Sequence, residues 1–416
     1  MSNETGKGPQ LEYLVSGLFQ NQGYLTRRSI PLHYGESNQD ATDIDVVGII
    51  FTPPFQLHKV ICDCKNKQKS KPYERIFWAK GLAQFVGAKD VYVSLPQASW
   101  DTVKFAQKGD VRILTSDNVE EYYKLNPNLY GTADDKFYSS FFSNINNEIK
   151  SNKALAEVWN SLRKLFLNID PYVSVNIAME LLLNASKQLV YSKDSGAKYT
   201  NSFWKYVCCE SIVLVGLNIL NICSDTLCLP VKAREQHILS KLTYGDIEPN
   251  KINTILEYAK NVANEMIKSS VPKTALPKSN VVDFGEISPP PYANNIIGLV
   301  ERALQNPEWY INLPQVLDLI LFEFAVKNKQ FTISTFENVF KTGYTEGKIK
   351  AAKNVLVFVK NACNTNFKLL WDNSDSFFEK RNESINKADN LQEKTSENLV
   401  SNENVEILSN NKEPKN

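Results

Sequence analysis

Two carboxylates and one ammonium occur at strand-like spacing near the start of the chain. Asp63 and Lys65 are two positions apart in the segment 57–65, LHKVICDCK, and Asp45 lies in the segment 43–51, DIDVVGIIF. Side chains at positions i and i+2 of a strand share a face, so Asp63 and Lys65 point the same way. If the two segments pair as a hairpin, the three side chains converge on one patch.

Such a patch has the chemistry of a site for a hard divalent cation. Mg²⁺ or Mn²⁺ takes oxygen ligands and is commonly held by one or two carboxylates, with water and phosphate completing the set. Asp45 and Asp63 are the predicted ligands, and the backbone carbonyl of Cys64 could add a third. A bound metal acidifies water and neutralises charge on a phosphodiester in the transition state. Lys65 would orient that water or stabilise the developing charge.

Each of these assignments has a structural alternative. Asp43 competes with Asp45, because both lie on the same face of the predicted strand. We favour Asp45, since Asp43 could be a strand-entry residue that is satisfied by backbone N–H groups. Asp63 and Lys65 could form an ordinary cross-strand ion pair, but a charged face on an otherwise buried strand is unfavourable unless it is functional.

The segments 42–48, TDIDVVG, and 60–65, VICDCK, resemble the motif of the PD-(D/E)XK nuclease superfamily. Mrr-like restriction endonucleases and Holliday-junction resolvases are its most similar branches, although Ile44 stands where the family name has proline. The resemblance covers about the first 120 residues. It implies a restriction-endonuclease-like fold and metal-dependent phosphodiester hydrolysis. An upstream helix often supplies a glutamate in this family, and Glu12 matches that position, which implies a catalytic and metal-binding role.

A basic cluster follows the motif and suits a phosphate backbone. The candidate nucleic-acid contacts are Lys67, Lys69, Lys71 and Arg75, and, more weakly, Gln84 on the same predicted helix. A solvated surface run is the alternative interpretation of these lysines. Three aromatic residues are interleaved with them, and we expect most of these in the core: Tyr73, Phe77 and Trp78.

The elements around these residues predict an α/β core with a mixed sheet flanked by helices. An apolar stripe at helical spacing indicates a helix over 10–22. The segments 24–32, 43–51 and 57–65 follow as strands, and short turns between them favour antiparallel pairing. Alternating elements come next, with helices at 73–87 and 99–107 and strands at 90–95 and 111–115. These later strands arrive through helical crossovers.

The chain of 416 residues is long enough for two or three domains. Helical spacing dominates after about residue 130, so we expect a mainly α-helical region there. The expected segments are a nuclease-like domain at 1–125, a helical domain at 130–270, a Pro/Ser-rich linker at 271–294, a second helical domain at 295–372 and a disordered tail at 381–416.

Composition bounds the partners and the compartment. A net charge of +1 gives no overall argument for nucleic acid, so that argument must come from local clustering. Seven cysteines at irregular spacing indicate reduced thiols in the cytoplasm. We expect no secretory signal and no membrane contact, because the apolar stretch 211–223 is shorter than a span and suits a buried core helix.

The function predicted from the sequence is that of a metal-dependent nuclease, assigned as an endonuclease, that hydrolyses phosphodiester bonds of nucleic acid, with DNA favoured over RNA. Its architecture resembles effectors of bacterial restriction or anti-phage defence, with the helical region binding substrate, a second copy or a protein partner. No nucleotide-binding P-loop is present, so an ATPase activity would belong to another chain. The rival interpretation is a non-catalytic scaffold subunit that uses a nuclease-like fold in a multi-protein complex.

Overall fold

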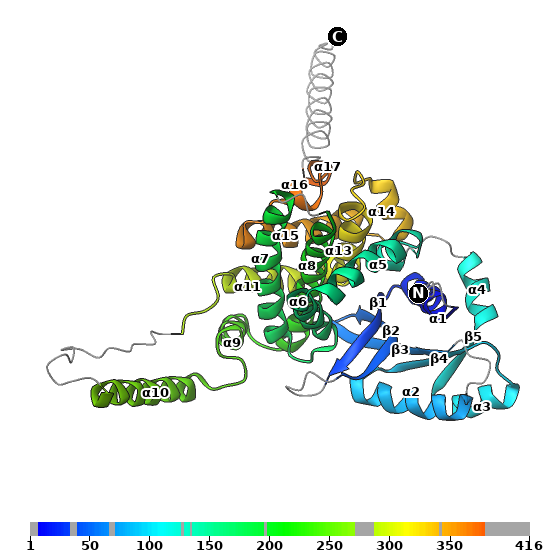
Figure 1. Ribbon diagram of the computed structural model, residues 1–416, viewed down its shortest axis with the longest axis horizontal. Coiled ribbons are helices and arrows are strands. Elements are labelled where there is room, and N and C mark those ends of the chain that lie inside the picture. The colour runs from blue at the N-terminus through cyan, green and yellow to red at the C-terminus, as the bar shows by residue number, and fades with distance from the viewer. Residues whose placement is uncertain are drawn as a thin grey trace, which may run out of the picture.

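Five strands form a mixed sheet in the order β1-β2-β3-β4-β5 in the computed structural model (Figure 1). The structure describes residues 7–33, 40–65, 71–125, 129–133, 135–194, 198–270, 287–340 and 343–378. The strands are β1 (Leu25–His33), β2 (Asp40–Thr52), β3 (Gln56–Cys64), β4 (Asp90–Leu95) and β5 (Val111–Thr115). The helices interspersed with them are α1 (Lys7–Asn21), α2 (Pro72–Val86), α3 (Trp100–Lys108) and α4 (Ser116–Leu125).

The pairing follows the lengths of the connections. β1, β2 and β3 pair antiparallel, since short connections let the chain reverse between neighbours. β3, β4 and β5 pair parallel, because α2 and α3 carry the chain back along the sheet. The predicted α/β core with a mixed sheet is confirmed. The sequence did not predict α4, which follows β5 directly.

Helices cover both faces of the sheet (Figure 1). One face packs Val60 and Cys62 of β3 against α1 and α4, while Ile61 between them belongs to the core on the opposite side. Both neighbours of Asp63 in sequence, Cys62 and Cys64, therefore point away from it into an apolar layer. The expected alternation along β3 explains how a buried strand can present Asp63 on one face.

A mainly helical region follows the sheet, as predicted. Its longer helices are α5 (Asp135–Ser151), α6 (Lys153–Lys164), α7 (Pro171–Asp194), α8 (Lys198–Thr226), α9 (Val231–Tyr244), α10 (Pro249–Ser270), α11 (Ala293–Gln305) and α15 (Thr345–Cys363). Short helices complete it: α12 (Pro307–Tyr310), α13 (Leu313–Asp318), α14 (Ile333–Val339), α16 (Phe367–Leu370) and α17 (Asp375–Phe378). A π-helical turn, Leu319–Ala325, continues α13. The expected linker lies outside the described residues as far as residue 286, and the expected tail at 381–416 lies wholly outside them.

α8 is the central helix of this region. Its segment Asn201–Thr226 is long and apolar enough to cross a membrane, but 89% of its most apolar window is buried inside the protein. Gly216 permits a close approach to α13, since a Cβ at this position would lie 2.4 Å from Leu317 Cδ1. This burial is typical of the core helix of a soluble protein, which is the interpretation that the sequence favoured for 211–223.

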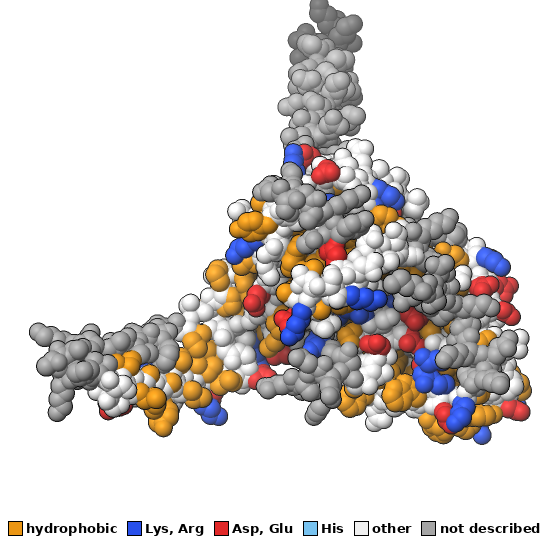
Figure 2. Space-filling view, in the orientation of Figure 1, with side chains coloured by type: hydrophobic (Ala, Val, Ile, Leu, Met, Phe, Trp, Pro, Cys, Tyr) orange, Lys and Arg blue, Asp and Glu red, His pale blue; other side chains and the backbone are white. Residues whose placement is uncertain are grey.

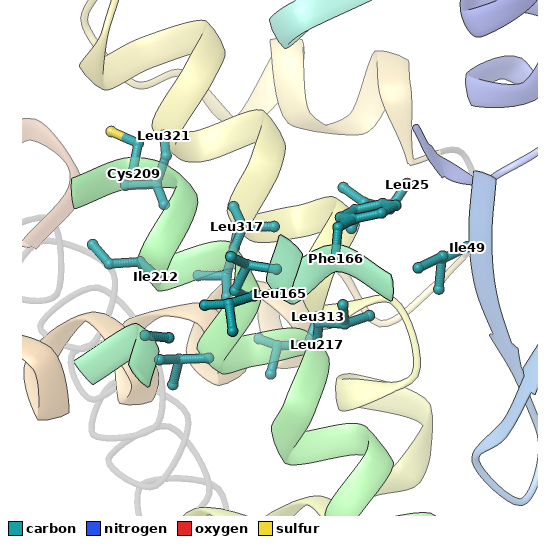
Figure 3. Close-up of a cluster of buried hydrophobic side chains, with 14 of the residues drawn as sticks. Leu25, Ile49, Leu165, Phe166, Cys209, Ile212, Leu217, Leu313, Leu317 and Leu321 are labelled. Carbon is teal, nitrogen blue, oxygen red and sulfur yellow. The ribbon is translucent and has the colours of Figure 1, made fainter. Parts of the chain in front are cut away.

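The sheet and the helical region share one hydrophobic core. Figure 3 shows Leu25 and Ile49 of the sheet facing Phe166 and Leu313 of the helical region. The two helical segments expected as separate domains also pack together, because α11 and α15 both contact α8. The candidate site residues on β1 to β3 are therefore held by a sheet whose edge is itself packed against helices.

A buried ion cluster fixes the same interface. Arg27 of β1 donates from Nε to Glu210 Oε1 at 2.8 Å and from Nη2 to Asp318 Oδ1 at 2.7 Å. All three side chains are nearly inaccessible to solvent. Burial raises the pKa of Asp318 to about 6, although the positive charge of Arg27 opposes this shift. A charge in such a place is tolerated only when it is paired.

Candidate active site

Three polar residues line up across neighbouring strands of the sheet. The pairs on either side in the β1–β2 ladder place Ser29 opposite Asp45. The terminal pair of the β2–β3 ladder is Val46 with Cys62, and continuing the register by one residue places Asp45 opposite Asp63. Ser29 has a φ of 50°, in the left-handed region that few residues other than glycine adopt. Such strained residues often mark functional sites.

Lys65 joins the two aspartates. Its Nζ lies 3.2 Å from Asp45 Oδ2 and 3.3 Å from Asp63 Oδ1. The backbone N–H of Cys64 also donates to Asp45 Oδ2, at 2.7 Å, which fixes that carboxylate against the end of β3. The structure thus brings together the Asp45, Asp63 and Lys65 side chains, as the hairpin argument from the sequence required. Asp43, the competitor of Asp45, is exposed.

Arg75 is the second cation of the site. Pro72 begins α2, a position that suits proline because its ring fits the first turn of a helix. Arg75 lies in that turn and donates from Nε to Asp63 Oδ2 at 2.7 Å and from Nη2 to Asp63 Oδ1. Both carboxylate oxygens of Asp63 are therefore engaged by one guanidinium. Asp63 itself is only 7% exposed.

Glu12 of α1 lies beside this cluster. Ser29 Oγ donates to Glu12 Oε2 at 3.2 Å. Burial first, and then the negative charge of Asp45, raise the pKa of Glu12 to about 7, while Arg28 and Ser29 oppose the shift. A carboxyl group with a pKa near neutrality can accept or release a proton under ordinary conditions, which is the property of a general acid or base.

The charges of Asp45 and Lys65 depend on each other. Burial raises the pKa of Asp45 and the charge of Asp63 adds to this, whereas the Cys64 amide and the Lys65 ammonium oppose it. Burial alone would lower the pKa of Lys65, but Asp63 and Asp45 outweigh it and raise that pKa. Lys65 is therefore a permanent cation near neutral pH, suited to electrostatic stabilisation rather than to proton transfer.

The donor set suits a hard divalent cation held by few protein ligands. Asp45 and Asp63 meet at one ammonium, so the negative charge that would hold Mg²⁺ or Mn²⁺ is already gathered. Within the described residues, no three side chains of His, Cys, Asp or Glu are grouped closely enough to hold a metal ion. The structure therefore does not bring Glu12 into one ligand group with the two aspartates, and its role as a ligand stays a prediction. Two carboxylates with the Cys64 carbonyl and water remain a normal set for Mg²⁺.

Those predicted nucleic-acid contacts that lie within the described residues do not gather on one surface. Lys71 is exposed and pairs with Glu74 Oε1 at 2.7 Å, while Arg75 turns inward to Asp63. Gln84 is exposed but lies nine residues further along α2, about 13 Å from Arg75 at the rise of an α-helix. Lys67 and Lys69 lie outside the described residues.

One expectation about this helix is wrong. The sequence predicts most of Tyr73, Phe77 and Trp78 in the core, but their exposed fractions are 44%, 68% and 46%. α2 buries small and branched residues against the sheet instead, among them Ile76 and Ala79. The bulky rings therefore project away from the sheet.

Sequence reasoning also missed Ser29 and the inward orientation of Arg75. Ser29 carries no local motif, and only the strand register places it opposite Asp45. Arg75 was recognisable as a cation near the motif, but its spacing from Asp63 gives no indication of a bidentate pair. Both depend on the geometry of the sheet and on where α2 begins.

Comparisons with known proteins identify nothing similar: no family model, no curated protein and no solved structure matches the chain. Its function must therefore be inferred from the geometry and the chemistry of the site.

Proposed function

We propose that the N-terminal sheet carries a metal-dependent endonuclease site that hydrolyses phosphodiester bonds, as members of the PD-(D/E)XK superfamily do. The convergence of Asp45 of β2 and Asp63, near the end of the neighbouring strand β3, on the ammonium of Lys65 is the observation that carries the proposal. The pKa of Glu12, near 7 beside this cluster, supports it further. Perturbed carboxylates that gather with a lysine are common at functional sites.

Each residue has a distinct task in this proposal. Asp45, Asp63 and the Cys64 carbonyl would hold Mg²⁺ or Mn²⁺, which when bound supplies Lewis-acid stabilisation of the phosphodiester and an acidified water. Lys65, kept protonated by the two aspartates, stabilises negative charge on the phosphate oxygens. Glu12 accepts a proton from the water or assists a second ion.

The guanidinium of Arg75 can take part through its shape. Its planar fork binds a carboxylate in the structure, and the same fork matches two oxygens of a phosphate. A phosphate group at the site could therefore accept the hydrogen bonds that Arg75 donates to Asp63 in the structure. This exchange would leave the Asp63 oxygens available to the metal.

The proposal extends to the substrate, the partners and the compartment. We favour DNA over RNA, and an effector of restriction or anti-phage defence, because the motif segments resemble those nucleases. The helical region would then bind substrate, a second copy or a protein partner. Seven free cysteines, six of them buried, are compatible with a cytoplasmic location.

The scaffold function remains the second candidate, and one observation favours it. Arg75 and Lys65 together engage both oxygens of Asp63, so the cluster can serve as a structural ion-pair network. Calorimetric titration of the folded protein with Mn²⁺ separates the two functions. Binding that Asp63→Asn abolishes supports the nuclease, whereas a lack of binding supports the scaffold.

Cleavage is the direct test. Wild-type protein, Asp63→Ala and Lys65→Ala are incubated with supercoiled plasmid, single-stranded DNA and RNA, each with Mg²⁺, Mn²⁺ or EDTA. Lys241→Ala is a matched control, because Lys241 is 30% exposed and pairs with one aspartate, while Lys65 is 34% exposed. We expect metal-dependent cutting by the wild type and the control alone. Undiminished cutting by Lys65→Ala would show that the site has been assigned wrongly.

A further inference from the structure

Four exposed aromatic side chains and the partly buried Phe105 lie on α2 and α3, the helices that cover one side of the sheet. We call this group the aromatic platform; it consists of Tyr73, Phe77 and Trp78 of α2 with Trp100 and Phe105 of α3. Phe77 and Trp100 are the most accessible, at 68% and 67% exposed. Exposed apolar patches often mark interaction sites.

Three rings of the platform are in contact across the two helices. The Phe105 ring meets the Tyr73 ring at a centroid distance of 4.8 Å and the Phe77 ring at 5.6 Å, both edge to face. Figure 2 shows apolar side chains interleaved with charged ones along the lower right edge of the molecule, where Figure 1 places α2 and α3. The contact through Phe105 holds the Tyr73 and Phe77 rings at a fixed spacing.

Cations are built into the platform. The guanidinium of Arg75 lies 5.9 Å from the ring centre of Trp78, and Lys104 Nζ lies 5.3 Å from that of Trp100. α2 and α3 together carry four basic residues against two acidic ones. A second copy docked on this surface would bring like charges together, whereas a polyanion with flat rings of its own would be attracted.

We propose that the aromatic platform binds unpaired bases of a single-stranded nucleic acid, next to the candidate active site. Bases stack on exposed aromatic rings while nearby cations follow the phosphates. Tyr73 and Trp78 flank Arg75 in sequence, and Arg75 contacts Asp63, so a strand on the platform has its backbone beside the site. This inference rests on the proposed nuclease function, because it names the form of substrate that the same site would receive.

The test measures binding without chemistry. Fluorescence anisotropy is recorded in EDTA for labelled oligo(dT) and oligo(U) of about 16 nucleotides and for a DNA duplex of about 16 base pairs. Phe77→Ala and Trp100→Ala remove exposed rings on different helices, so a folding defect in one does not compromise the other. Phe77→Tyr keeps a ring, and Tyr258→Ala is the matched control, since Tyr258 is 72% exposed on α10.

We expect the wild type to prefer a single strand over the duplex. Each alanine variant should bind the single strand about 5- to 150-fold more weakly, the range for loss of one stacked base. Phe77→Tyr and Tyr258→Ala should bind like the wild type. A preference for either DNA or RNA would identify the source of the strand without changing the role of the platform.

Three results would overturn the inference: a preference for duplex, unchanged binding in both alanine variants, or a wild-type dimer that both variants dissociate in sedimentation. The last result would assign the platform to a second copy of the chain. Failure of the proposed function looks different, since single-strand binding that depends on Phe77 and Trp100 would persist in a protein that cuts nothing with Mg²⁺ or Mn²⁺.

Discussion

Replacing Arg75 with glutamine should strengthen the binding of Mn²⁺ to the free protein. Arg75 donates to both oxygens of Asp63, through Nε to Oδ2 at 2.7 Å and through Nη2 to Oδ1. A metal that takes Asp63 as a ligand must first displace one of these donors. Arg75→Gln removes the fork and its positive charge, so the metal no longer competes with them.

The size of the effect follows from the burial of the pair. A hydrogen bond to a charged group contributes about 1.5–3 kcal/mol. Asp63 is 7% exposed and Arg75 is 27% exposed, so water screens the pair only in part. Opening one such bond would weaken metal binding by about 10- to 150-fold. We therefore expect Arg75→Gln to bind Mn²⁺ at least about tenfold more tightly than the wild type.

Isothermal titration calorimetry with Mn²⁺, without nucleic acid, measures this directly. Arg112→Gln is the matched control, because Arg112 Nη1 lies 2.7 Å from Asp90 Oδ1 in an ion pair outside the site. Its affinity for Mn²⁺ should equal that of the wild type. The competition argument is refuted if Arg75→Gln binds Mn²⁺ no more tightly than the wild type while Asp63→Asn abolishes binding. In that case Asp63 binds the metal without giving up its hydrogen bonds from Arg75.

Two further predictions concern the free energy of unfolding. The pKa of Glu12 rises from 4.5 to about 7 on folding, so its contribution to stability is present below about pH 4.5 and is lost as the pH rises towards 7. Urea unfolding across this range should show a loss of about 3 kcal/mol in the wild type that Glu12→Gln lacks; equal pH dependence of the two proteins would contradict it. Arg27→Met leaves Glu210 and Asp318 buried without a counter-ion, and should lose about 3–5 kcal/mol, of which Asp318→Asn in the same chain should restore part. The exposed control Arg112→Met should lose less than about 1 kcal/mol, and a comparably small loss for Arg27→Met would show that the cluster is not tightly paired.

Local sequence patterns predicted the sheet well, because each strand has a recognisable apolar pattern within its own few residues. Alternation along 57–65 identified the face of Asp63, and the short apolar runs at 90–95 and 111–115 have the bounds of β4 and β5. Connection lengths then determined which neighbours pair antiparallel. These are properties of chain segments, so no distant contact was needed to infer them.

The aromatic residues of α2 show where such patterns fail. The apolar residues of α2 are distributed around the whole helix. Its sequence therefore has no clear polar face that would mark the side exposed to solvent. Close packing on the sheet selects the side with Ala79 and Ala83, whose small side chains let the helix approach. Phe77 is left outside for that geometric reason, and hydrophobicity alone predicts the opposite.

Contacts between residues far apart in sequence cannot be predicted from local patterns. Some of these contacts hold the strand that carries part of the candidate site. Arg27 finds Glu210 and Asp318 at separations of 183 and 291 residues, and Arg163 of α6 donates to the Arg28 carbonyl at 3.1 Å. Both contacts hold β1, the strand that carries Ser29 opposite Asp45. A fragment limited to residues 7–125 would leave Arg27 without its partners and uncover the apolar core that the sheet shares with the helices. The helical region is therefore part of what positions the candidate site, and metal binding and cleavage are to be measured on the full chain.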